Sequence, residues 1–122
     1  MTKPPPAGKT AGVIGTGRIG AVVARLLWHL RCNVLAYDFH ENDDLKKLGV
    51  KYVSQEELLA QSDIVTLNCP LTEQTKHLIG RQTLATLKRG VMVVNTGRGA
   101  LIDTSAAVDV RTPTATVHTV SP

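Results

Sequence analysis

The chain has 122 residues, a formal net charge of +4, and 43% hydrophobic but only 3% aromatic residues. This length fits one domain with an aliphatic core, which suits buried parallel strands. The basic residues are scattered without base-stacking aromatics and no run is long enough to span a bilayer, so we expect a soluble, cytoplasmic protein without nucleic-acid or membrane partners.

The N-terminal part of the chain predicts a strand, a glycine-rich turn and a helix. Residues 1–8 are rich in proline and predict an irregular lead-in. The apolar run at 9–15 predicts a strand, and 18–30 predicts a helix. Apolar side chains recur in that helix at helical spacing, so we expect them to pack on the sheet: Ile19, Val22, Val23, Leu26, Leu27 and Leu30.

The turn between this strand and this helix has the pattern G-x-G-x-x-G. Gly15 would allow a sharp turn, Gly17 would let a pyrophosphate approach the backbone, and Gly20 would let the helix pack closely on the strand. Asp38 ends the next predicted strand, 18 residues past Gly20. An aspartate there would bond the adenosine ribose hydroxyls and repel a 2′-phosphate, so the pattern predicts NAD rather than NADP. The alternative is a tight turn with a surface aspartate.

The rest of the chain alternates predicted strands and helices. Asn42 or Asp43 is expected to cap one helix that Gly49 ends, and Ser54-Gln55-Glu56-Glu57 has the form of a capping box. This alternation predicts an α/β fold, a Rossmann-type doubly wound parallel sheet with strand order 3-2-1-4-5. The expected strands are 33–38, 50–53, 63–68 and 91–95, and the expected helices are 42–48, 54–61, 81–87 and one starting near 101–104.

The pattern ends after residue 107. Residues 108–122 show no clear helix or strand boundary, so we expect a divergent, disordered tail and a cofactor domain over 9–107. Residues 108–110 either form a late strand of the sheet or continue the preceding helix, and we favour the helix. The strand at 91–95 would then be an exposed edge that invites self-association.

The predicted topology brings four segments to one edge of the sheet. The glycine turn, Asp38, residues 68–70 and residues 95–99 all follow carboxyl ends of strands. A ligand crevice at that edge is typical of doubly wound folds. Cys32 and Cys69 lack metal-ligand spacing, so we expect buried thiols and no metal site.

Five segments together resemble the D-isomer-specific 2-hydroxyacid dehydrogenases, in particular the members similar to D-lactate dehydrogenases. These segments are 8–20, 34–38, 62–72, 75–79 and 94–103. In that family a hydride passes between NAD(H) and a 2-keto or D-2-hydroxy acid, and the cofactor domain is inserted between two parts of a substrate domain. The resemblance implies a partial NAD-binding domain, a small 2-keto or 2-hydroxy acid substrate of the pyruvate and D-lactate type in the intact enzyme, and allows a homodimer.

The resemblance also assigns site residues. The family's Asn-x-x-Arg-Gly turn is 95–99 here, and its arginine binds the substrate carboxylate and carbonyl, so Arg98 is the implied catalytic residue. Asn68 stands where the family commonly has histidine. The implied cofactor contacts are Gly15, Thr16, Gly17, Arg18, Ile19 and Gly20 on the turn, Asp38 at the ribose, Asn68, Cys69 and Pro70 along the crevice, and Thr96, Gly97 and Arg98 near the nicotinamide.

The chain departs from the family in its acid/base residues. The family's glutamate and histidine lie beyond the arginine turn, but no glutamate follows Arg98 here, and His118 lies in a different context. We therefore expect a truncated product that lacks turnover alone. Two alternatives stay open, a non-catalytic NAD-binding module and a non-functional fragment.

Overall fold

The strands lie in one parallel sheet. The computed structural model describes residues 8–103 and 115–119. Across the sheet the strand order is β3-β2-β1-β4-β5-β6, and every neighbouring pair is parallel. In chain order the elements are β1 (Thr10–Ile14), α1 (Arg18–His29), β2 (Asn33–Tyr37), α2 (Asp43–Leu48), β3 (Lys51–Tyr52), α3 (Gln55–Gln61), β4 (Ile64–Leu67), α4 (Arg81–Leu84), β5 (Val91–Asn95), a 3₁₀ turn (Gly99–Leu101) and β6 (Ala115–Thr119).

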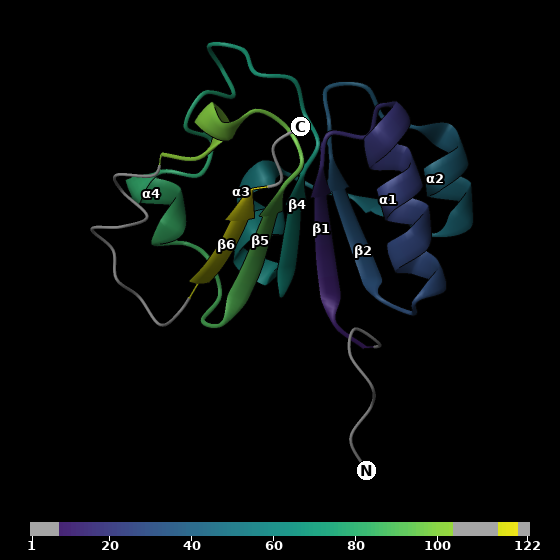
Figure 1. Ribbon diagram of the computed structural model, residues 1–122. Helices are drawn as coiled ribbons and strands as arrows, with labels where there is room; N and C mark the ends of the chain where they lie inside the picture. Colours follow the sequence, from purple (N-terminus) through teal and green to yellow (C-terminus); the bar gives the residue numbers. More distant parts are fainter. Residues whose placement is uncertain (1–7, 104–114, 120–122) are drawn as a thin grey trace.

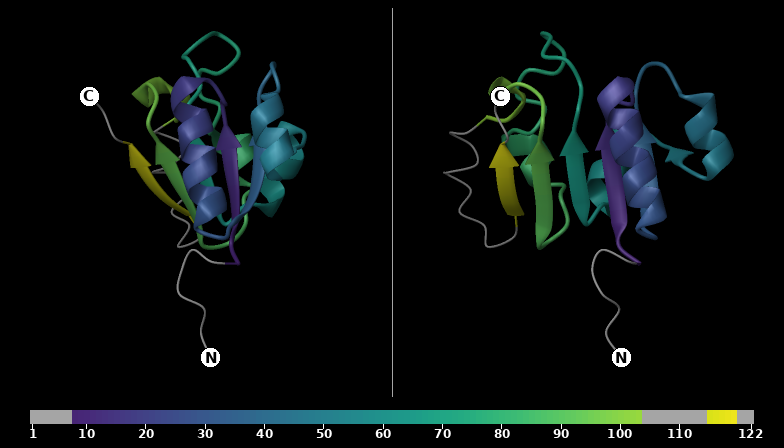
Figure 2. Two further views of the ribbon diagram at one scale, coloured as in Figure 1. Left: turned by 90° about the vertical axis from the view of Figure 1, so that its right-hand side faces the viewer. Right: turned by 45° about the vertical axis from the view of Figure 1, so that its right-hand side comes forward.

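Helices pack against both faces of the sheet. Figure 1 shows α1 in front of β1 and β2 and α3 behind the sheet, and Figure 2 shows β5 and β6 on the side away from α2. Alternate residues of β1 enter two cores, Val13 with α1 and α2 and Ile14 with α3. Burial on both faces explains why these strands are almost continuously apolar.

The predicted order of the first five strands is confirmed, and so are the predicted N-caps Asn42 and Ser54. Asn42 Oδ1 accepts the Leu45 N–H at 3.2 Å, and Ser54 Oγ accepts the Glu57 N–H at 3.2 Å. Gly49 ends α2 with a φ of +125°, a conformation that favours glycine. The helix α4 is shorter than predicted because the chain tightens after Leu84, where the Leu87 N–H donates to the Leu84 carbonyl three residues back.

The prediction of an exposed edge at β5 is wrong. β6 pairs with β5 in parallel from Val91↔Ala115 to Asn95↔Thr119. The expected disordered tail is therefore also wrong for residues 115–119. Residues 108–114 and 120–122, including the segment 108–110 for which we favour a helix, lie outside the described residues. The β6 sequence is rich in threonine and valine, which favour strands, but pairing with β5 was needed to select that conformation.

The predicted packing face of α1 is also wrong for most of its residues. The helix buries Gly20, Ala21 and Ala24, because small residues allow its backbone to approach β1. Four large apolar residues instead face outward, and only Val23 and Leu27 of the expected set are partly buried. We call the four outward residues the α1 stripe: Ile19, Val22, Leu26 and Leu30. None of the helices in the described part of the chain is long and apolar enough to cross a membrane.

Asp63 links the amino ends of β1, β4 and β5. Its Oδ2 accepts the Thr10 N–H at 2.9 Å, and its Oδ1 lies 2.8 Å from Lys88 Nζ. Its own backbone bonds Thr10 and Met92. The bond from the Lys88 ammonium, followed by that from the Thr10 N–H, lowers the pKa of the Asp63 carboxyl.

We expect Asp63→Asn to destabilise the fold by about 1 kcal/mol at pH 7, because the ion pair is partly exposed. Because the pKa of the carboxyl is lower in the folded than in the unfolded state, the stabilisation is fully present at pH values above the unfolded-state pKa of about 4. It is lost as the pH falls through the folded-state pKa. Urea titrations at pH 7 and pH 3 measure the effect, with the exposed Glu73→Gln as control. A difference from wild type that is equally large at both pH values would contradict the assignment.

Candidate cofactor-binding site

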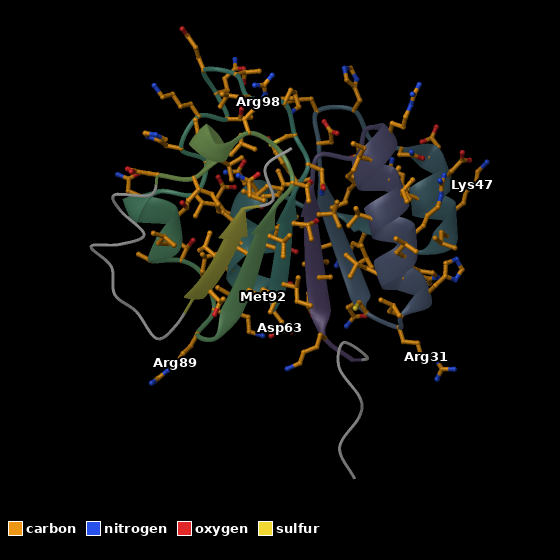
Figure 3. All side chains as sticks on the ribbon, in the orientation of Figure 1. Arg31, Lys47, Asp63, Arg89, Met92 and Arg98 are labelled. Carbon is orange, nitrogen blue, oxygen red and sulfur yellow. The ribbon has the colours of Figure 1, made fainter. Side chains whose placement is uncertain are left out.

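The carboxyl ends of four strands meet in register at one edge of the sheet. Ile14 pairs with Tyr37 on one side and with Leu67 on the other, and Leu67 pairs with Asn95. The residues that follow these positions therefore lie side by side, which brings together the glycine turn, Asp38, Asn68 and Thr96. Figure 3 shows Arg98 at this edge, at the opposite end of the sheet from Asp63.

The glycine turn fits tightly against the chain at two positions and is open at the third. Gly15 has a φ of +91°, and a Cβ there would lie 2.7 Å from the Cys69 nitrogen. A Cβ on Gly20 would lie 1.7 Å from the Gly15 carbonyl oxygen, whereas one on Gly17 would meet nothing within 4 Å. The open side leads to the first turn of α1, whose N–H groups have no partners within the helix and attract anions.

The Asp38 carboxylate is bonded to the glycine turn itself. Its Oδ2 accepts the Thr16 N–H at 2.7 Å, and its Oδ1 accepts the Phe39 N–H at 2.7 Å. Thr16 is buried, and its hydroxyl lies 3.3 Å from the same Oδ2. Within this structure Thr16 therefore fastens the turn to Asp38, which the sequence pattern did not indicate.

A buried asparagine shapes the turn that carries Arg98. Asn95 is fully buried, its Nδ2 donates to the Arg98 carbonyl at 2.9 Å, and its Oδ1 accepts the Gly97 N–H at 2.9 Å. These two bonds explain why an asparagine precedes the arginine by three residues. Arg98 itself is exposed.

Asn68 connects the ends of β4 and β5. Its Oδ1 accepts the Thr96 hydroxyl at 2.6 Å, and its Nδ2 donates to Thr66 Oγ1 at 3.0 Å. The neutral Asn68 amide thus accepts one hydrogen bond and donates another, and neither bond requires a charged side chain. The next residue is Cys69. Burial is the main cause that raises the pKa of its thiol, and the negative charge of Asp38 raises it further.

Two adjoining cavities open at this edge, and Cys69 and Pro70 line both. The first, about 420 Å³, lies between the β2 end and the 69–78 loop, and the second, about 700 Å³, lies between the glycine turn and the Arg98 turn. Eleven of the thirteen predicted site residues line one or the other, and the exceptions are Thr16 and Gly20. Arg18 and Arg98 both line the second cavity, so it suits an anion.

Several residues that line the first cavity were not indicated by the sequence pattern. Phe39 and His40 directly follow Asp38, and that position was a usable signal. Residues far along the chain, such as Gln55 and Gln74, carried no such signal because only the fold brings them to the edge. The missed lining residues are Ile14, Tyr37, Phe39, His40, Gln55, Thr72, Gln74, Thr75 and Leu78.

Among the described lining residues of the second cavity there is no histidine that could act as an acid/base group. His77 lines neither cavity, and its Nδ1 lies 3.9 Å from Asp103 Oδ2. The backbone of His118 pairs with Val94 in the sheet. A general acid must lie within hydrogen-bond reach of the reacting atom, so His77 is not assigned that role.

The fold and this edge define a dinucleotide-binding domain, and comparison with known proteins specifies its family. The sequence profile described as "D-isomer specific 2-hydroxyacid dehydrogenase, NAD binding domain" matches residues 1–112. The chain therefore belongs to this family, and the expected fold class and the expected cofactor, NAD, are confirmed.

Individual proteins that are similar to this chain are also described as 2-hydroxyacid or D-lactate dehydrogenases. A "2-hydroxyacid dehydrogenase homolog" from Haemophilus influenzae is 50% identical over 102 residues, which cover 84% of this chain and 31% of that protein. The structure of Salmonella D-lactate dehydrogenase matches with a TM-score of 0.82 at 46% identity, over 84% of this chain and 31% of that one. D-lactate dehydrogenase from Aquifex aeolicus, crystallised with NAD and lactic acid, matches with a TM-score of 0.82 at 42% identity. The match covers 83% of this chain and 30% of that one. The chain thus spans about a third of the length of these relatives.

Proposed function

We propose that this chain holds NAD(H) for a D-2-hydroxyacid dehydrogenase of the D-lactate type, which transfers a hydride between the nicotinamide and a 2-keto acid. The observation that supports this most is the Asp38 carboxylate, fixed beside an open glycine turn. Asp38 would accept an adenosine ribose hydroxyl, and its charge would repel a 2′-phosphate. The first cavity has room beside Asp38 for the adenosine, and the N–H groups at the start of α1 would bind the pyrophosphate.

Arg98 is the residue that we propose for substrate binding. Its guanidinium is exposed at the second cavity, where it would bind the carboxylate of a 2-keto acid and orient the carbonyl toward the nicotinamide. Bound NADH supplies the hydride. Reduction also needs a proton at the carbonyl oxygen, and the described residues bring no histidine to this cavity. We therefore propose that the chain binds NAD(H) but does not turn over substrate alone.

Calorimetric titration with NADH and NADPH tests this function, followed by an assay of NADH oxidation with pyruvate. We expect saturable NADH binding, NADPH binding weaker by about tenfold or more, and no oxidation above the control without protein. Binding without turnover fits both an incomplete enzyme and a non-catalytic module. Robust oxidation would overturn the proposed inactivity, and absent binding with a collapsed amide spectrum would identify a non-functional fragment.

We also propose that the chain forms a homodimer through the α1 stripe. Ile19, Val22, Leu26 and Leu30 are 66%, 49%, 58% and 52% exposed at successive helical turns, and contiguous apolar surface of this kind marks interaction sites. Leu26→Lys should convert a dimer to a monomer in analytical ultracentrifugation, whereas Arg25→Lys, at an exposed neighbouring position, should not. A wild-type chain that stays monomeric at high concentration would contradict the proposal.

We place the protein in the cytoplasm. Both cysteines, Cys32 and Cys69, are buried thiols, which suits a reducing compartment.

A further inference from the structure

The hydroxyl of Tyr52 contacts Thr16 of the glycine turn, and Tyr52 lines neither cavity. Tyr52 is the last residue of β3 and is half-buried. Its hydroxyl lies 2.7 Å from Thr16 Oγ1 and accepts the Asn42 N–H at 2.9 Å. It therefore joins the loop before α2 to the same threonine that bonds Asp38.

The ends of this chain of bonds set the direction of the protons within it. The Asn42 N–H can only donate, and the ionised Asp38 carboxylate can only accept. Tyr52 and Thr16 have one hydroxyl proton each. Every group is satisfied when the Asn42 N–H donates to Tyr52, the Tyr52 hydroxyl donates to Thr16, and the Thr16 hydroxyl donates to Asp38 Oδ2. Successive bonds of this kind polarise and strengthen one another.

We propose that Tyr52 is a positioning residue for the cofactor, which acts through Thr16 to orient the Asp38 carboxylate. Oδ2 accepts both the N–H and the hydroxyl of Thr16, whereas Oδ1 accepts, within the described part of the chain, only the Phe39 N–H. A carboxylate has about four acceptor positions, so Oδ1 is the oxygen left open to a ribose hydroxyl. This inference rests on the proposed function of Asp38 and extends it to a residue that does not itself touch the cofactor.

NADH titration of Tyr52→Phe tests the proposal, because this change removes only the hydroxyl. Loss of one neutral hydrogen bond predicts an NADH dissociation constant raised about threefold to tenfold. Thr16→Val should weaken NADH binding to a similar degree, and Thr16→Ser should restore it. Thr86→Val is the matched control, since its exposed hydroxyl donates to the Thr83 carbonyl in α4.

A double-mutant cycle separates positioning from a general structural effect. In an Asp38→Ala background Tyr52→Phe should change NADH affinity by less than about twofold, because its effect passes through that carboxylate. An equal loss in both backgrounds, or wild-type affinity for Tyr52→Phe alone, would overturn the proposal. Thermal melting of each variant shows whether folding is retained.

The cofactor-free chain provides a second readout. Tyr52→Phe should shift the amide resonances of Asn42 and Thr16 in a ¹H–¹⁵N spectrum, and Thr86→Val should shift neither. Unchanged resonances would show that the chain of bonds does not exist in solution. If the wild type fails to bind NADH, the proposed function fails and the role of Tyr52 fails with it, whereas NADH binding by an insensitive Tyr52→Phe overturns the role of Tyr52 alone.

Discussion

Gly20→Ala should destabilise the chain by at least about 3 kcal/mol, because the new methyl group would overlap backbone. Its Cβ would lie 1.7 Å from the Gly15 carbonyl oxygen and 2.7 Å from the Gly15 carbonyl carbon. No rotamer change can relieve this contact, so α1 would have to move away from β1. Chemical denaturation followed by circular dichroism measures the loss.

Gly17→Ala is the matched change within the same turn. Gly17 has a φ of −71°, which alanine adopts readily, and its added Cβ would meet nothing within 4 Å. We expect stability within about 0.5 kcal/mol of wild type. The methyl group would nevertheless obstruct the pyrophosphate, so NADH affinity should fall about tenfold or more. Equal stability losses for the two variants would contradict the different roles assigned to the two glycines.

Asp38→Ala should weaken NADH binding between about tenfold and a hundredfold, because a hydrogen bond to a charged group is lost. Affinity for NADPH should fall less or rise, because the charge that repels a 2′-phosphate is also removed. The ratio of the two dissociation constants, measured by calorimetry, is therefore the decisive quantity. The variant also removes the acceptor of the Thr16 and Phe39 N–H groups, which could loosen the turn. A looser turn would weaken the binding of both cofactors alike, so this effect cancels in the ratio.

The control for this change is Asp44→Ala, which removes an exposed carboxylate from α2 outside both cavities. It should leave both affinities unchanged. An Asp38→Ala variant that keeps the wild-type preference for NADH would show that this carboxylate does not select the cofactor.

Most of the residues that meet at this edge of the sheet could be predicted, because the local backbone there requires special residues. Gly15 is needed for a positive φ, Gly20 for close packing, and Asn95 for two bonds within its own turn. These requirements act over a few residues, so they leave a readable pattern. Strand alternation then placed the segments at one edge, and the order β3-β2-β1-β4-β5 agrees with that expectation.

The role of Tyr52 could not be predicted in the same way. The Tyr52 and Thr16 hydroxyls bond across 36 positions of sequence, and Asn42 lies on a third segment. A tyrosine in a short strand gives no local sign of such a partner. Its hydroxyl can contact Thr16 only because β3 lies beside β2, which in turn lies beside β1, the strand that leads into the glycine turn.

The sequence by itself determined the family and the cofactor, and it indicated the glycine turn, Asp38 and the Arg98 turn as candidate site residues, because each depends on local backbone geometry or on a distinctive motif. The tertiary structure decided which face of α1 is buried, and it selected the small residues Gly20, Ala21 and Ala24 over the larger apolar ones. It also decided that residues 115–119 form β6. Helix faces and edge strands depend on contacts with distant segments, and composition along one stretch does not contain that information.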